Sequence, residues 1–134
     1  MKALFVFAFV FCYVAATGEW EDVDVNDEKA QEMSRHGAEL VNGHLRSRYH
    51  YKLIDFVKAR RQVVAGLNFE VKIVIQETSC AKTEKTFEEA KDCDVRDGGE
   101  TRYCTVRVWE KVWEHKLTMT SFSCSTSPFN DEED

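Results

Sequence analysis

The stretch that decides the fold is RQVVAGLNFE, residues 61–70. Its centre is an apolar run, Val63-Val64-Ala65, which ends in Gly66 and lies between two longer segments with the composition of β-strands. Residues that connect strands normally face water and are polar. An apolar turn exposed to water is typical of a binding surface rather than of a core, so this turn is the first candidate functional site.

The segments on both sides of this turn have the pattern of two long strands. Residues 48–61 are β-branched, aromatic and basic, without Gly or Pro, which predicts one strand. Residues 67–78 alternate between apolar and polar side chains, which predicts a second strand with one face toward a core. Residues 62–66 are predicted to form the turn between them. The core-facing residues of the second strand are predicted to be Phe69, Val71, Ile73 and Ile75.

A helix is predicted before these strands. Residues 26–28 (NDE) combine a capping side chain with acids in the first turn, and residues 42–43 (NG) are a typical helix stop. Between them, small and apolar residues recur at spacings of three and four, which predicts one narrow packing face. Gly37 lies on this face, where the missing side chain permits close approach of a sheet. The face consists of Ala30, Met33, Gly37, Leu40, Val41 and His44.

The rest of the chain adds two strands and three polar segments. Residues 102–109 and 117–124 alternate again and predict strands. Residues 17–25 are predicted to be an extended, mobile lead-in, residues 81–100 a surface excursion, and the acidic tail after Pro128 to be frayed. These elements predict an α+β domain in which an antiparallel sheet of four to five strands wraps on one α-helix.

The N-terminal segment has the pattern of a secretory signal. Lys2 is followed by an apolar run and then by small residues up to Ala16. The run is short of the roughly 20 apolar residues that span a bilayer, which disfavours a membrane anchor. We therefore expect residues 1–16 to be a signal peptide, cleaved after Ala16 or a residue or two later. Residues 17–134 would then form one secreted, extracellular domain.

The cysteines predict disulfides. Cys12 would leave with the signal, and the remaining four are an even number in an oxidising compartment. Four cysteines allow three pairings, of which the sequential one is the simplest. Zinc binding is the competing interpretation, but the spacings contain no C-x-x-C pair. The four are Cys80, Cys93, Cys104 and Cys124.

Charge and composition exclude several functions. The chain has 18 Lys and Arg against 24 Asp and Glu, a formal net charge of −6. Nucleic-acid binding needs a basic face, and the one basic cluster, residues 58–61, is short and is interpreted as a solvated strand edge. The histidines are scattered without metal-ligand spacing, and there is no Gly-rich phosphate loop. We predict no metal, no cofactor and no catalytic residue.

A second apolar turn is predicted at residues 112–115, where Val112 and Trp113 stand between the last two strands. In the predicted sheet this turn lies at the same end as residues 62–66, and the segment around Gly18 can reach that end. Tryptophan in such a position is a common interface anchor. The alternative is that Trp113 folds back onto the sheet and that the valines are partly buried.

The ordered set of features resembles the cystatin family. Residues 62–66 match its Gln-x-Val-x-Gly signature, a helix precedes them, and four cysteines follow with a tryptophan turn between the last two. The resemblance covers nearly the whole mature chain and is closest to the secreted, two-disulfide (type 2) cystatins. It implies a tight, reversible inhibitor of papain-like cysteine proteases such as cathepsins. We expect a monomer that binds neither a membrane nor a nucleic acid.

The resemblance also implies a site and a disulfide pairing. Three elements would form a wedge that enters the protease cleft: the segment at Gly18, the first hairpin and the second hairpin. The implied disulfides are Cys80–Cys93 and Cys104–Cys124, which agrees with sequential pairing. The implied contact residues are Gly18, Gln62, Val63, Val64, Ala65, Gly66, Val112 and Trp113.

Three positions depart from the family pattern. Val112 stands where the family usually has proline, so we expect at most a modest loss of affinity. Cleavage after Ala16 leaves only Thr17 ahead of Gly18, which would weaken the N-terminal contact. Arg46 stands where some members carry an asparagine that binds legumain, so no legumain inhibition of that kind is expected. The alternative functions are a non-inhibitory secreted cystatin-fold binding or signalling protein, and a membrane-active protein, which the acidic charge disfavours.

Overall fold

The computed structural model describes residues 18–130, so the predicted signal peptide at residues 1–16 lies outside the described residues. Two longer strand pairs and one long helix dominate this part of the chain. The elements are β1 (Trp20–Val23), α2 (Glu28–His44), β2 (Tyr49–Val64), β3 (Gly66–Ala81), α3 (Phe87–Ala90), β4 (Thr101–Lys111), the 3-10 turn η1 (Val112–Glu114) and β5 (Lys116–Ser125).

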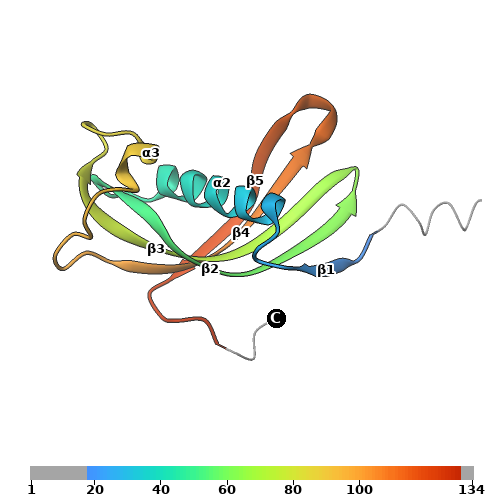
Figure 1. Cartoon of the computed structure of the whole chain (residues 1–134), viewed down its shortest axis with the longest axis horizontal. Helices are drawn as coiled ribbons and strands as arrows, with labels where there is room; N and C mark the ends of the chain where they lie inside the picture. The colour runs from blue at the N-terminus through green and yellow to red at the C-terminus, as the bar shows by residue number, and fades with distance from the viewer. Residues whose placement is uncertain (1–17, 131–134) are drawn as a thin grey trace, which may run out of the picture.

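The five strands form one antiparallel sheet in the order β1-β2-β3-β4-β5, and α2 lies across one of its faces (Figure 1). The core is the layer between them. Phe69, Val71, Ile73 and Ile75 of β3 are all buried there, as their alternation predicts. This arrangement confirms the α+β class and the antiparallel sheet wrapped on one helix.

The prediction that residues 17–25 are an extended, mobile lead-in is wrong in one respect, because residues 20–23 form an edge strand. β1 pairs with β2 from Trp20↔Gln62 to Val23↔Ala59. Glu21 also accepts two hydrogen bonds from Arg61, at 3.1 and 2.6 Å. A four-residue strand is too short for its periodicity to be recognised in the sequence. Its pairing partner, about 40 residues further along the chain, gives no local signal either.

Helix α2 begins as predicted and ends slightly later. Asp27 is its N-cap, and the carboxylate accepts a hydrogen bond of 3.0 Å from the amide of Ala30. The predicted stop at residues 42–43 does not end the helix, because the Asn42 side chain is buried and accepts from the amide of Tyr51 at 2.7 Å. Gly37 approaches the sheet closely: a Cβ there would lie 3.3 Å from Val71 Cγ2. His44, which is predicted to belong to the packing face of the helix, is exposed to water instead.

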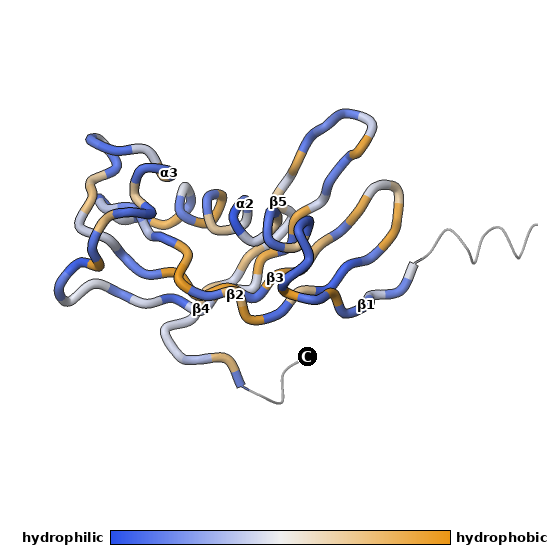
Figure 2. The backbone as a smooth tube through the Cα atoms, viewed as in Figure 1, coloured by the Kyte–Doolittle hydropathy of each residue, from blue (hydrophilic) through white to orange (hydrophobic). Residues whose placement is uncertain are grey.

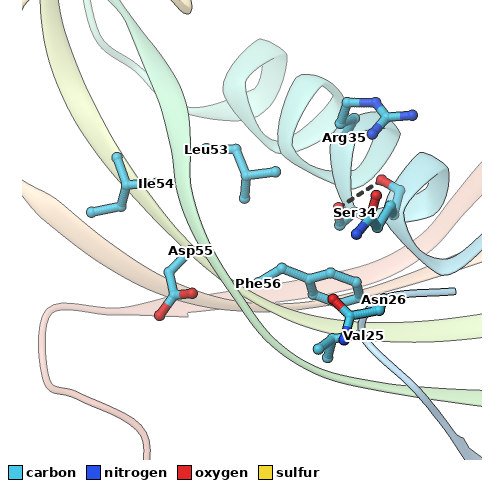
Figure 3. Close-up of a pocket in the computed structure, with 9 residues that line it drawn as sticks. Val25, Asn26, Ser34, Arg35, Leu53, Ile54, Asp55 and Phe56 are labelled. Atoms are coloured by element: carbon cyan, nitrogen blue, oxygen red, sulfur yellow. Dashed lines mark hydrogen bonds between the residues drawn. The ribbon is translucent and has the colours of Figure 1, made fainter. Parts of the chain in front are cut away.

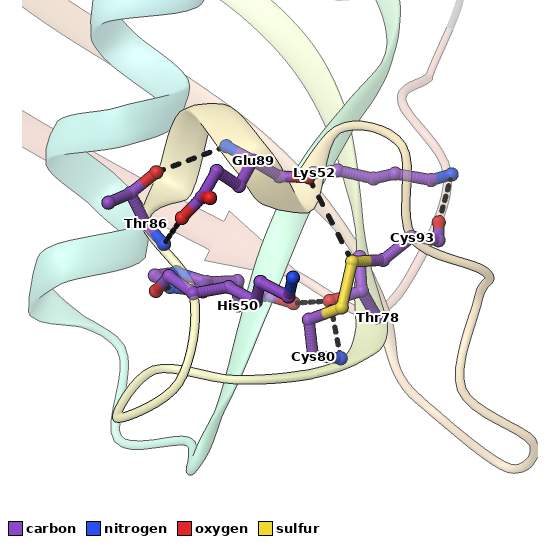
Figure 4. The surroundings of a disulfide bond; sticks show 8 residues. His50, Lys52, Thr78, Cys80, Thr86, Glu89 and Cys93 are labelled. Atoms are coloured by element: carbon purple, nitrogen blue, oxygen red, sulfur yellow. Dashed lines mark hydrogen bonds between the residues drawn. A yellow bond between two sulfur atoms is a disulfide. The ribbon is translucent and has the colours of Figure 1, made fainter.

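Both predicted disulfides are confirmed. Cys104 and Cys124 are directly opposed across β4 and β5. Cys80–Cys93 closes the polar excursion at residues 81–100, which contains the short helix α3 (Figure 4). A capping box orders this helix: the hydroxyl of Thr86 accepts from the Glu89 amide, and the Glu89 carboxylate accepts from the Thr86 amide.

The segment after Pro128 is not frayed where it is described. Phe129 packs edge-on against Tyr103, with the ring centroids 5.7 Å apart, and Lys72 Nζ lies 5.1 Å from the Phe129 centroid. The acidic residues 131–134 lie outside the described residues. Within residues 18–130, no helix is long and apolar enough to cross a membrane.

Candidate functional site

The first hairpin tip is tighter than the sequence predicts. β2 and β3 pair up to Val64↔Gly66, which leaves Ala65 alone between the strands. Gln62 and Val63 therefore belong to β2 rather than to a turn. Val63 is 55 % exposed and Ala65 is also exposed, whereas Val64 is less exposed and partly buried. The structure thus places an apolar group in water at this tip, chiefly through Val63.

Gly66 is required by the shape of this tip. Its φ is +93°, in the left-handed region that favours glycine. An added Cβ would also clash with the Glu110 carbonyl and lie 2.9 Å from Trp109 Nε1. The same indole nitrogen donates a hydrogen bond of 2.8 Å to the Ala65 carbonyl. The first tip is therefore packed against β4, the strand that leads to the second tip.

The second hairpin tip exposes two large apolar side chains. Trp113 is 60 % exposed and Val112 is 51 % exposed, so Trp113 does not fold back onto the sheet. The turn is a single 3-10 turn closed by His115, which has a φ of +50°. Lys111 and Glu114 form an ion pair of 3.5 Å across it.

The N-terminal segment lies against the first hairpin. A Cβ on Gly18 would overlap the Val63 carbonyl, so the absence of a side chain permits this contact. Gln62 Nε2 donates to the Gly18 carbonyl at 3.1 Å, and Asn68 Nδ2 donates to Gln62 Oε1 at 3.0 Å. The Gln62 amide is thus held between β3 and the N-terminal segment.

The three predicted elements come together at one end of the sheet. The pairs Trp20↔Gln62 and Leu67↔Glu110 bring the N-terminal segment, the first tip and the start of η1 to neighbouring positions, and β3 contacts η1. Figure 1 shows both hairpin tips and β1 at the same end, and Figure 2 shows apolar colour at the turn between β2 and β3. Sequence reasoning missed Asn68 and Trp109, whose only signal is their outward position in predicted strands.

A buried carboxylate holds the outer face of the sheet behind these tips. Glu70 accepts from Arg60 at 3.0 and 2.7 Å and from Arg107 at 2.9 Å. Burial raises the pKa of Glu70, but the two guanidinium groups outweigh burial and hold this pKa below its ordinary value. Trp20 lies over both, 5.2 Å from Arg60 Cζ and 5.0 Å from Arg107 Cζ. The sheet edge predicted for residues 58–61 is wrong at Arg60 and Arg61, because β1 pairs with β2 at these two residues.

A second ion pair fixes the helix to the strand before the second tip. Lys29 Nζ of α2 lies 2.7 Å from Glu110 Oε2 of β4. The hydrogen bond that Lys29 donates to the Glu110 carboxylate raises the pKa of Lys29, which favours the charged form of the ammonium group.

A hollow of about 400 Å³ lies between α2 and β2, away from the tips (Figure 3). It is lined by residues 53–56 of β2 and by helix residues that include Ser34 and Arg35. None of its lining residues belongs to the hairpin tips or to β1. Among the described residues, no group of three or more His, Cys, Asp or Glu side chains could hold a metal ion.

These features define a disulfide-braced α+β domain that presents two apolar hairpin tips beside an N-terminal strand. The family described as Cystatin domain matches residues 18–113. The chain belongs to the cystatin family, and its two disulfides fit the type 2 members. Cystatins are protease inhibitors and not enzymes.

Similar proteins include "L-cystatin" of Tachypleus tridentatus, which is 36 % identical over 107 residues that cover 80 % of each chain. The crystal structure of Al-CPI is 30 % identical, with a TM-score of 0.67 over 81 % of this chain and 100 % of that one. Dimeric human cystatin F has a TM-score of 0.72 over 81 % of this chain and 87 % of its own, and at 22 % identity it supports the fold alone.

Proposed function

We propose that this protein is a secreted, reversible, tight-binding inhibitor of papain-like cysteine proteases such as cathepsins. The observation that supports this function best is the shared display of Val63, Val112 and Trp113 in water at one end of a rigid sheet. The protein would occlude the active-site cleft with the segment at Gly18 and the two hairpin tips. It would act as a monomer.

The physical basis is burial of apolar area that is already in place. Each Å² of apolar surface removed from water contributes about 25 cal/mol before the costs of association. The paired strands and the Cys104–Cys124 bridge hold the tips before binding, so little conformational entropy is lost. A wedge of this kind fills a cleft without offering a scissile peptide bond to the catalytic thiolate.

Secretion is proposed on the signal pattern of residues 1–16 and on the two disulfides, which persist in oxidising compartments. Cleavage after Ala16 would retain Gly18 and its contact with Gln62. Residues 17–134 would then be the mature cystatin domain.

The test is titration of the purified mature protein into active-site-titrated papain, with activity measured at each ratio. We expect activity to fall in proportion to the protein added, and to return after dilution with excess substrate. The double variant Val63→Ser, Trp113→Ala should inhibit at least about 30-fold less tightly, because truncating an interface anchor costs about 2 kcal/mol or more.

The matched control is Val57→Ser, because Val57 is 44 % exposed on the same strand β2 but lies away from the tips. It should inhibit like the wild type. Unchanged inhibition by the double variant would show that the assigned wedge is wrong. No inhibition by micromolar wild-type protein would overturn the proposal and favour a non-inhibitory cystatin-fold binding or signalling protein.

A further inference from the structure

We propose that Asn68 and Trp109 are positioning residues that hold the three elements of the wedge in register before a protease binds. This inference rests on the proposed function and deepens it. Neither side chain is part of a hairpin tip or of the signature at residues 62–66. Each makes a hydrogen bond into one of the wedge elements.

The two residues belong to one transverse row of side chains. Strand register places Trp20, Gln62, Asn68 and Trp109 directly beside one another on β1, β2, β3 and β4. Their chain neighbours Phe69 and Val108 are buried in the core, so this row lies on the sheet face opposite to α2. The row crosses the sheet immediately behind the tips, and we call these four residues the brace.

One half of the brace has a fixed direction. Asn68 donates to Gln62 Oε1, so the Gln62 amide must turn its NH₂ group toward the Gly18 carbonyl. If residue 68 could only accept, the Gln62 amide would turn around and present its oxygen to that carbonyl. Asn68 therefore controls the contact of Gly18 without touching it.

The other half joins the two hairpins. The Trp109 indole donates to the carbonyl of Ala65, the residue at the first tip, and Trp109 stands three residues before η1 and the second tip. Lys111 Nζ lies 4.8 Å from the Trp109 ring centroid and restrains that ring. The hydrogen bond from Trp109 to Ala65 thereby sets the spacing between the first hairpin tip, which carries Val63, and the second, which carries Trp113.

Asn68 is tested by a double-mutant cycle with the N-terminal element. Asn68→Asp keeps the size of the side chain and removes the donor. We expect Asn68→Asp to weaken inhibition of papain about 2- to 12-fold in the mature protein, the range for one lost hydrogen bond. In protein shortened to begin at Glu19, the same substitution should have no further effect. An equal penalty in both backgrounds would show that Asn68 does not act through Gly18.

Trp109 is tested by a cycle with the second tip. Trp109→Phe keeps a ring and removes the N–H donor, and should weaken inhibition about 2- to 12-fold. The penalty should vanish when combined with Trp113→Ala, because spacing is irrelevant once the second tip no longer binds. Tyr103→Phe, at the other end of β4, is the control and should leave inhibition unchanged. A Trp109→Phe penalty that survives Trp113→Ala would overturn this part.

Amide hydrogen exchange of the free protein tests the brace without a protease. Asn68→Asp should increase exchange in residues 18–23 while the amides of β4 and β5 keep their protection. Trp109→Phe should increase exchange at residues 64–67. Unchanged exchange in both variants would refute the brace, whether or not the wild-type protein inhibits papain. Increased exchange together with absent inhibition would support the brace and refute the proposed function alone.

Discussion

At the scale of single residues, the first tip depends on a glycine that cannot be replaced without moving a neighbouring strand. Gly66 combines a positive φ with close approach to the Glu110 carbonyl and the Trp109 indole. Gly43, near the end of α2, has ordinary helical surroundings with nothing within 4 Å of an added Cβ. The same chemical change should therefore have opposite effects at the two positions.

Gly66→Ala should lower the free energy of unfolding by about 1–3 kcal/mol, because strain at a positive φ adds to the clash. Gly43→Ala should raise it by about 0.5–1 kcal/mol through helix propensity. Urea unfolding followed by circular dichroism measures both. Equal effects of one sign would contradict the conformation described for Gly66.

At the scale of elements, the excursion of residues 81–100 and the wedge lie at opposite ends of the sheet (Figure 1). Cys80–Cys93 closes a span of 13 residues around α3, whereas Cys104–Cys124 joins the two strands that carry the second tip. Removal of the Cys80–Cys93 bridge should therefore lower stability without affecting inhibition.

The double variant Cys80→Ser, Cys93→Ser should lose about 2–4 kcal/mol of stability, because the bridge no longer restricts the unfolded chain. Inhibition of papain at 25 °C should not change. Cys104→Ser, Cys124→Ser is the comparison and should weaken both, since Cys104 is fully buried in the core beneath that hairpin. Thermal melts and inhibition titrations give the two readouts, and a loss of inhibition in the first variant would show that the ends of the sheet are coupled.

At the scale of the whole molecule, the outer face is joined by the contact of Glu70 with Arg60 and Arg107 beneath Trp20, which connects β1 through β4. The pKa of Glu70 is lowered in the folded protein, so folding favours its ionised form. Its contribution to stability is therefore complete above the ordinary value of 4.5 and is lost as the pH falls below that value.

Glu70→Gln should lower the free energy of unfolding by about 1–3 kcal/mol at pH 7, the range for hydrogen bonds to a charged group. The difference from the wild type should shrink as the pH falls below 4.5, because proton binding to the wild-type carboxylate then increasingly favours the unfolded chain, whereas Gln does not titrate. Urea unfolding at several pH values measures this difference. The exposed Glu39→Gln should show none, and a Glu70→Gln difference that stays constant with pH would contradict the role of the ionised carboxylate.

The parts of this protein that the sequence predicted are those encoded by local patterns. Alternation placed Phe69 and Ile73 in the core, and a capping side chain located the start of α2 at residues 26–28. The even number of cysteines predicted disulfides, and the family resemblance implied their pairing. The signature at residues 62–66, taken together with the helix before it and the cysteines and tryptophan turn after it, identified the family. These features are local patterns or their order along the chain, so they can be read without the fold.

Tertiary structure alone decided which residues that are distant in the sequence lie next to one another in the fold. The pairing of Trp20 with Gln62, the contact of Trp109 with Ala65 and the enclosure of Glu70 by two arginines depend on strand register, which no single strand specifies. Register also decided that Val63 faces water more than Val64. The sequence by itself determined an apolar turn on an antiparallel sheet, and the pairing of five strands determined which atoms hold that turn in place.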